Sequence, residues 1–150
     1  MRWTAGEAEI DALLTSGALQ RVSGAAADGG SWIEKARQKC ATAYAVIEDD
    51  PESAIVLSYD AARFVCTALL AQQGLRPTSQ GGHYAVERAA RAQFGDAFRP
   101  FGALRRRRNE LEYPLFAGAM VDADEAAAAV ATAQDLAAAA ARLLPELGIF

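Results

Sequence analysis

The residues best suited to chemistry stand in one short stretch, LRRRRNELEYP, from Leu104 to Pro114. Four consecutive arginines are followed by an asparagine, two glutamates and a tyrosine. Arginine offers a planar fork of N–H donors that matches a phosphate or a carboxylate. The whole chain nevertheless carries a formal net charge of −4 and a pI near 5.0, so we expect no broad positive face for coating duplex nucleic acid. Any contact with nucleic acid would have to be local.

The four arginines point in different directions if this stretch is a helix. At about 100° per residue, one stripe collects four residues at spacings of three, four and three: Phe101, Leu104, Arg108 and Leu111. Arg108 therefore stands where the pattern asks for an apolar residue, whereas Arg106 and Glu110 point the opposite way, to solvent. A desolvated guanidinium keeps its charge and needs a carboxylate, a phosphate or several other acceptors.

The helix face that carries Arg108 also carries other polar side chains. Glu112 lies four residues further on and is the obvious ion-pair partner. Arg105 lies beside both, and Asn109 and Tyr113 continue round the same side at the C-terminal end of the helix. One interpretation is an Arg108–Glu112 pair at the edge of the core, with Tyr113 packed and the other arginines solvated. The other is a polar pocket or dimer cleft that receives a phosphate.

Three residues outside this helix could join it. His83, the single histidine, follows two glycines near the expected start of a helix. It either packs or hydrogen-bonds locally, or it enters the cleft as a substitute acid or base. Asp60 and Arg63 are spaced as an ion pair on another helix. They would meet the arginine helix if the two helices are neighbours.

The chain contains no pattern of metal ligands or cofactor loops. Its two cysteines, Cys40 and Cys66, fall inside apolar helical patterns and are expected to be buried, reduced thiols. One histidine and two separated cysteines give no zinc-ligand set, and no glycine-rich phosphate loop has the required spacing. We therefore expect neither a metal nor a cofactor.

The elements that must position these residues are expected to be helices throughout. Alanine is abundant and no stretch alternates with a period of two residues. We expect a short helix near residues 7–14, a flexible connection at 23–30, and then a helix that starts with a capping box of Ser31 and Glu34. The apolar stripe of that helix consists of Ile33, Ala36, Cys40, Ala43 and Ile47.

The helix after it is expected to be central in the fold. Asp50 is its expected N-cap and Pro51 its first residue, and it should reach about Gln73 before a terminal Gly74. Its apolar stripe consists of Ile55, Tyr59, Ala62, Cys66 and Leu69. After a turn-rich loop at 74–83, three more helices are expected at about 84–94, between Pro100 and Pro114, and from about 122–125 to before Pro145.

Long helices joined by loops predict an all-α fold, an antiparallel four-helix-type bundle with additional short helices. A chain of 150 residues has the length of one domain, so we expect a single domain over residues 1–150 with its core at about 31–144. The N-terminal residues hold no apolar signal core, and Asp135 and Arg142 interrupt the alanine-rich run near the C-terminus. A soluble, cytoplasmic protein without a membrane partner is therefore expected.

Two stretches resemble the HEPN superfamily of small helical domains. YDAARFVCTALLAQQGLRPTSQGGHYAV resembles the family's middle helices, and RNELEY resembles its Arg-x(4–6)-His motif, often written with Asn directly after the Arg. The likeness covers roughly residues 31–144. A subgroup with Arg-x-x-Arg-Asn-x-x-Glu-Tyr at this place corresponds to Arg105, Arg108, Asn109, Glu112 and Tyr113.

The resemblance implies a helical core, commonly dimeric, in which two motifs face each other across a cleft. Many members are metal-independent endoribonucleases, including toxins of toxin–antitoxin pairs. Others are RNA-binding modules or partners of nucleotidyltransferases. In catalytic members the Arg binds the scissile phosphate and the His assists proton transfer from the ribose 2′-OH. Here the residue five positions after Arg108 is Tyr113 instead of His. A tyrosine, whose ordinary pKa is about 10, is a poor base near neutral pH.

The sequence therefore predicts an RNA- or nucleotide-associated binding module that acts as a homodimer. Arg105 and Arg108 are its expected phosphate contacts, Asn109 and Tyr113 are further site residues, and Glu112 supports them. One alternative is a metal-independent ribonuclease that uses Arg108, Asn109 and Tyr113. Another is a purely structural bundle that packs on a protein partner. In the first two cases the expected protein partner is a nucleotidyltransferase-type protein or an antitoxin.

Overall fold

The computed structural model describes residues 1–115 and 120–150, and the prediction of an all-α fold is confirmed. The helices are α1 (Glu7–Thr15), α2 (Gly29–Ala45), α3 (Pro51–Gln72), α4 (Gly82–Phe94), α5 (Arg99–Glu112) and α6 (Ala123–Leu143). Single turns of 3₁₀ helix are formed by Gly24–Ala27, Gly95–Phe98 and Leu144–Glu146. Two short strands are β1 (Leu19–Arg21) and β2 (Leu75–Pro77).

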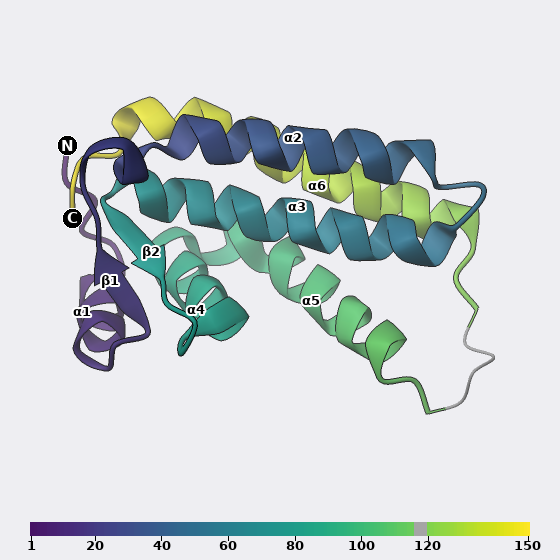
Figure 1. Cartoon of the computed structure of the whole chain (residues 1–150), viewed down its shortest axis with the longest axis horizontal. Coiled ribbons are helices and arrows are strands. Elements are labelled where there is room, and N and C mark those ends of the chain that lie inside the picture. Colours follow the sequence, from purple (N-terminus) through teal and green to yellow (C-terminus); the bar gives the residue numbers. More distant parts are fainter. Residues whose placement is uncertain (116–119) are drawn as a thin grey trace.

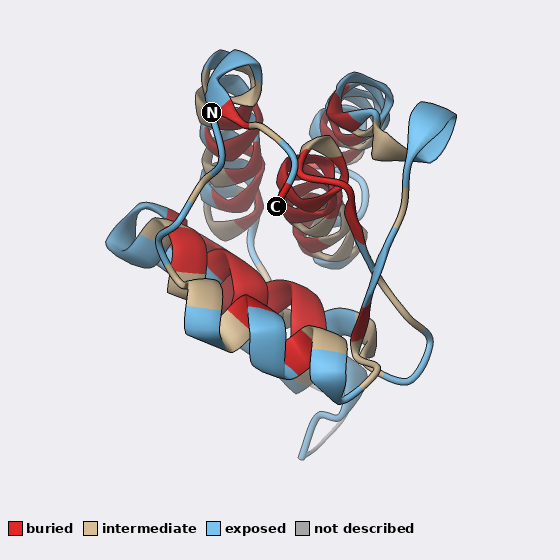
Figure 2. Cartoon of the chain, turned by 90° about the vertical axis from the view of Figure 1, so that its left-hand side faces the viewer, coloured by how far each residue is buried: buried red, intermediate tan, exposed pale blue. Residues whose placement is uncertain are grey.

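The long helices form the predicted antiparallel arrangement. α2, α3 and α6 lie side by side, and α5 packs on α3 at an angle to it (Figure 1). In chain order, α2, α3, α5 and α6 alternate in direction (Figure 1). The buried faces of the helices turn toward one another and the exposed faces turn outward (Figure 2). α1, α4 and the two strands gather at the end of the bundle where both termini lie (Figure 1).

Two helices begin where local signals predict. The Asp50 side chain accepts the backbone N–H of Ser53 at the start of α3, and Pro51 occupies the first turn. At its other end, Gly74 takes a positive φ of 72°, which a side chain disfavours. Asp122 caps α6 in the same way as Asp50 caps α3. These starts depend only on residues within a few positions.

The start of α2 differs from the prediction. The expected capping box of Ser31 and Glu34 is wrong, because the helix begins at Gly29 with Asp28 as its N-cap. The Ser31 hydroxyl instead donates to the Asp28 carboxylate. The Asp28 side chain accepts the backbone N–H of Gly30, which is a local cap, and a Cβ on Gly29 would lie 2.5 Å from the carbonyl oxygen of Ala68 in α3. The lack of a side chain lets the first turn of α2 approach α3 closely.

The loop expected at 74–83 contains β2, and the helix after it begins earlier than expected. β2 pairs antiparallel with β1, so that Gln20 lies opposite Arg76. α4 begins at Gly82, which places His83 in its first turn. Strands of three residues are too short to show alternation, and their pairing joins segments far apart in the chain. The sequence pattern therefore gave no sign of them.

α3 is the centre of the core, as predicted. Its five stripe residues are buried, and so are the five of the stripe before it, of which Ile47 lies just beyond the end of α2. Cys40 and Cys66 are buried and free, and burial raises the pKa of both thiols. By length and composition α3 would also fit a membrane span, but 78% of its most apolar window is buried inside the protein. Core packing accounts for the apolar surface of α3.

A smaller core lies at the end of the bundle. It joins α1, the two strands, α4 and the C-terminus through Ile10, Leu13, Leu19, Leu70, Leu75, Ala85, Ala89 and Phe150. The backbone N–H of Phe150 donates to the carbonyl of Gln73, which fastens the C-terminus to the end of α3. Because Leu70 belongs to this cluster, the same contacts hold the first turns of α4 against α3.

Candidate functional site

Arg108 lies against α3 at the surface of the bundle. Its Nη2 is 2.7 Å from Oε1 of Glu112, the partner that the spacing predicted. Its Nη1 donates to Oδ1 of Asn109 at 3.4 Å, and its Cζ lies 5.5 Å from the centroid of the Tyr59 ring. The Nε–H is buried and has no hydrogen-bond acceptor among the described residues. This guanidinium therefore has donor capacity that the chain does not use.

Tyr59, whose ring lies beneath Arg108, contacts His83, the single histidine of the chain. Tyr59 is fully buried, and its ring stacks on Phe101 of α5 with centroids 5.8 Å apart. The Tyr59 hydroxyl hydrogen-bonds to Nδ1 of His83 at 2.8 Å. Since Tyr59 belongs to α3 and His83 to α4, this bond is a tertiary contact. His83 therefore packs, as one of the two interpretations expects, and its hydrogen bond reaches another helix.

A second arginine reaches the same region from α3. Arg63 lies about one helical turn after Tyr59, and its Cζ is 4.5 Å from the centroid of the next residue's phenyl ring. Its Nη2 is 3.9 Å from Oδ1 of Asp60, so the predicted ion pair is long. Like Arg108, Arg63 has a buried Nε–H with no acceptor among the described residues. Both arginines act electrostatically on His83.

Burial and positive charge set the protonation of the Tyr59–His83 pair. Burial lowers the pKa of His83, and Arg63 and Arg108 lower it further, while Asp60 opposes them. Burial raises the pKa of Tyr59 to about 12, with the two arginines acting in the other direction. Both side chains are therefore neutral near pH 7. A bound anion would raise the pKa of His83, because it would offset the arginine charges.

Arg105 has a different partner from Arg108. Its Nε forms an ion pair with Glu87 of α4, and Oε1 of the same carboxylate lies 3.0 Å from Nη2 of Arg91. The Glu87 side chain is only 9% exposed, so two arginines neutralise a carboxylate buried between α4 and α5. Arg105 still lies near enough to contribute to the lowering of the His83 pKa. Arg105 therefore lies between the ion pairs of Glu87 and the surroundings of His83.

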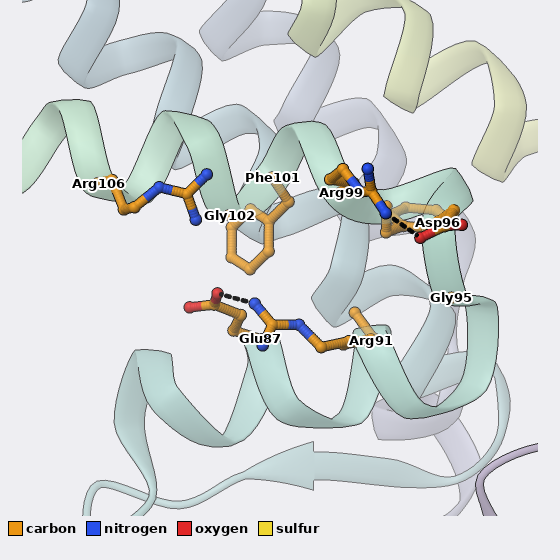
Figure 3. Close-up of a pocket in the computed structure, with 10 residues that line it drawn as sticks. Glu87, Arg91, Gly95, Asp96, Arg99, Phe101, Gly102 and Arg106 are labelled. Carbon is orange, nitrogen blue, oxygen red and sulfur yellow. Dashed lines mark hydrogen bonds and ion pairs between the residues drawn. The ribbon is translucent and has the colours of Figure 1, made fainter.

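A groove between α4 and α5 opens beside Glu87 (Figure 3). Its volume is about 390 Å³, and Arg91 and Arg106 extend toward Glu87 within it (Figure 3). The groove depends on Gly102, because a Cβ there would lie 3.2 Å from Oε1 of Glu87. Among the described residues that line it, none belongs to the predicted site. The groove and the Arg108 region are therefore separate.

The four consecutive arginines occupy four different environments. Arg106 is exposed, as predicted. Arg107 binds Glu125 of α6 through Nε and Nη2. Tyr113 ends the helix and is 80% exposed, so it does not pack, and its hydroxyl forms no hydrogen bond with the described residues. The structure thus brings Arg108, Asn109 and Glu112 together and leaves Tyr113 in solvent beyond them.

Sequence reasoning missed the partners that come from other helices. Tyr59 looked like an ordinary member of an apolar stripe, and Glu87 carried no visible signal. His83 could be singled out only because it is the sole histidine of the chain. Among residues 1–115 and 120–150, no three His, Cys, Asp or Glu side chains come together as metal ligands would.

The chain was compared with models of protein families, with curated proteins and with solved structures. None of the three comparisons found a match.

Proposed function

We propose that this chain is a HEPN-like module that binds the phosphate of RNA or of a nucleotide beside His83. The binding residues are Arg63, His83, Arg105 and Arg108, with Tyr59 beneath them, and we refer to these five residues as the His83 surface. One observation carries the proposal. Arg63 and Arg108, from two different helices, each keep a buried Nε–H without an acceptor among the described residues, and both act on one neutral histidine.

The chemistry of the His83 surface favours an anion with several oxygen atoms. Arg63 and Arg108 each lie over an aromatic ring, which leaves the edges of their guanidinium groups as donors. A phosphate can accept hydrogen bonds from both arginines at once, since it presents more than two acceptor oxygens. His83 can add a third donor from its ring when the anion raises its pKa.

The existing ion pair of Arg108 is a weak competitor for such an anion. Its partner Glu112 lies one helical turn away and is 37% exposed. Pairs of this kind stabilise a helix by about 0.3–0.5 kcal/mol. A bound phosphate can therefore displace Glu112 at small cost, and Asn109 remains beside the arginine as a further polar contact. The exposed Tyr113 offers a ring on which a base can stack.

The proposal includes a homodimer in which two His83 surfaces share one cleft. This part is motivated by the resemblance to HEPN domains and by the position of Arg105 and Arg108 on the outer part of the bundle, where both remain partly exposed. Analytical ultracentrifugation at micromolar concentration tests it. A monomer under these conditions would remove the shared cleft and leave a single-surface binding module.

The first experiment is a titration of single-stranded RNA measured by fluorescence anisotropy. We expect Arg108→Ala to weaken RNA binding by about tenfold or more, because a charge-assisted contact to phosphate is lost. The matched control is Arg106→Ala, which removes the same charge from the opposite side of the same helix. Equal losses in both variants would indicate nonspecific attraction. No RNA binding by the wild type would favour the purely structural bundle and its protein partner.

A metal-independent ribonuclease is the second candidate function. The observation that favours it is the Tyr59–His83 hydrogen bond beside Arg108, because a neutral imidazole can accept a proton. Cleavage of RNA in excess EDTA is the test, with wild type, Arg108→Ala, His83→Gln and Tyr113→Phe in parallel. Loss of cleavage in His83→Gln with cleavage retained in Tyr113→Phe would identify His83 as the proton carrier. Loss of cleavage in Tyr113→Phe would instead identify Tyr113 as the proton carrier.

A further inference from the structure

A separate cavity, lined by three cations, lies between α2, α3 and β2. Its volume is about 570 Å³, within the range of roughly 300–1,000 Å³ that small-molecule sites occupy. The residues that line it are Ala25, Ala26, Asp28, Ser31, Trp32, Lys35, Arg63, Thr67, Ala71, Arg76 and Pro77. We refer to this cavity as the Trp32 pocket. It shares only Arg63 with the His83 surface.

Three cations of the Trp32 pocket come from three different elements. Lys35 belongs to α2, Arg63 to α3 and Arg76 to β2. Lys35 Nζ lies 5.2 Å and Arg63 Cζ 4.5 Å from the centroid of the same Phe64 ring, so both cations lie beside one wall of the pocket. An anion bound among cations that line one cavity offsets their mutual repulsion.

The chain itself supplies little negative charge to balance these cations. Neither Lys35 nor Arg76 has an ion-pair partner among the described residues, and Arg63 has only the long contact to Asp60. Among the described residues that line the pocket, Asp28 supplies the one carboxylate. Its oxygens already accept the hydroxyl of Ser31 and a backbone N–H at the start of α2, and these bonds lower its pKa.

The rest of the wall is apolar and includes one aromatic ring. Trp32 is half-buried, and its ring lies 5.5 Å from that of Phe64 while Lys35 Nζ lies 5.2 Å from its centroid. Pro77 and three alanines complete the apolar part. A ligand that fits both parts of the wall carries a phosphate for the cations and a flat ring or short hydrocarbon for the apolar surface.

We propose that the Trp32 pocket binds a small organic phosphate that carries a ring, of the size of a nucleoside monophosphate. Lys35 and Arg76 bind the phosphate together with Arg63, and Trp32 and Pro77 contact the ring. This site does not depend on RNA binding at the His83 surface. Arg63 lies between the two sites, so an occupied Trp32 pocket also reduces the free positive charge beside His83.

Isothermal titration calorimetry with adenosine 5′-monophosphate as the probe tests this proposal. We expect Lys35→Ala and Arg76→Ala each to weaken binding by about tenfold, because each removes a charged donor to phosphate. Both side chains are exposed, so these variants are expected to fold. Lys39→Ala, about one turn further along α2 and outside the pocket, is the matched control and should change binding by less than about twofold. Adenosine, which lacks the phosphate, should bind far more weakly.

Three results would overturn the proposal. One is equal binding of adenosine and its monophosphate, which would show that the cations do not hold a phosphate. Another is unchanged binding in Lys35→Ala and Arg76→Ala. The third is loss of nucleotide binding in Arg108→Ala, since the probe would then occupy the His83 surface. Wild-type protein that binds RNA but no nucleotide would overturn this inference and leave the proposed function standing.

Discussion

Arg107 and Arg108 are neighbours in the chain, yet α5 places them in two regions that differ in how fully carboxylates occupy the arginine's donors. Arg107 faces α6, where its Nε and Nη2 lie 2.5 and 3.2 Å from the two oxygens of Glu125, and its Nη1 lies 3.1 Å from Glu110. Arg108 faces α3 and has one carboxylate partner, Glu112, on its own helix. The two side chains are similarly buried, 29% and 22% exposed.

The difference shows that burial alone does not separate a structural arginine from a binding arginine. The donors of Arg107 face two carboxylates, and the hydrogen bonds that it donates to Glu125 raise its pKa above the ordinary value. Arg108 keeps a buried Nε–H with no acceptor among the described residues. A complete set of acceptors indicates that the charge serves the contact between α5 and α6. An incomplete set indicates capacity for a ligand.

The largest expected effect comes from removing the ring beneath Arg108. Tyr59→Ala deletes a fully buried aromatic side chain, its stack on Phe101 and its bond to His83. We expect a loss of about 3–5 kcal/mol in the free energy of unfolding. Urea denaturation measures it, and Tyr113→Ala, an exposed tyrosine, should cost less than about 0.5 kcal/mol. Similar costs for the two variants would contradict the packing described for the His83 surface.

The next effect concerns RNA affinity and sharpens the contrast between the two regions. We expect Arg63→Ala to weaken RNA binding by about tenfold, the loss also expected for Arg108→Ala, because in the proposed complex both side chains contact one phosphate. Arg107→Ala should leave affinity within about twofold, since Glu125 already occupies that guanidinium. Anisotropy titrations at one fixed salt concentration measure all three. A larger loss in Arg107→Ala than in Arg63→Ala would move the binding site to the α5–α6 contact.

Substitution of Arg107 should reduce stability more than substitution of Arg108, although Arg108 should matter more for RNA binding. Arg107→Gln removes a two-oxygen contact between α5 and α6, and we expect it to cost about 1 kcal/mol of unfolding free energy. Arg108→Gln removes a single pair on one helix and should cost at most about 0.5 kcal/mol. Thermal and urea unfolding of both variants measure the difference. Greater destabilisation by Arg108→Gln would assign Arg108 to the architecture.

The smallest expected effect is the contribution of His83 to the pH dependence of the free energy of unfolding. Its pKa in the folded chain is lower than the ordinary 6.5, so below about pH 6.5 the unfolded chain takes up a proton more readily than the folded chain does. The stability contribution is present above that pH and is lost as pH falls. Urea unfolding at several pH values should show a shallower decline in His83→Gln than in the wild type. Identical declines would mean that His83 titrates alike in both states.

RNA binding should have the opposite pH dependence. A phosphate bound as proposed would raise the pKa of His83, so binding would be coupled to uptake of a proton and should tighten as pH falls. Anisotropy titrations of wild type and His83→Gln over the same pH range provide the measurement. Equal pH profiles for the two proteins would place the phosphate away from His83.

The features that sequence patterns predicted correctly are those whose causes lie within a few residues. Asp50 and Pro51 start α3, Asp122 starts α6, and the Arg108–Glu112 pair follows from helical spacing. The start of α2 was predicted wrongly although its cause is also local, because Asp28 competes with Ser31 as the cap and accepts the backbone N–H of Gly30. The partners of Tyr59 and His83, in contrast, have a tertiary cause.

The sequence by itself determined the helical class, the apolar stripes and the odd position of Arg108 within one of them. Periodicity and capping depend on neighbours in the chain, so they can be read without coordinates. Only the tertiary structure decided which residues complete the site. Tyr59, His83 and Glu87 acquire their partners across helix contacts, and the environments of Arg105 and Arg108 follow from them. Such pairings depend on how helices pack, because a side chain's partner lies on another element whose position no local pattern specifies.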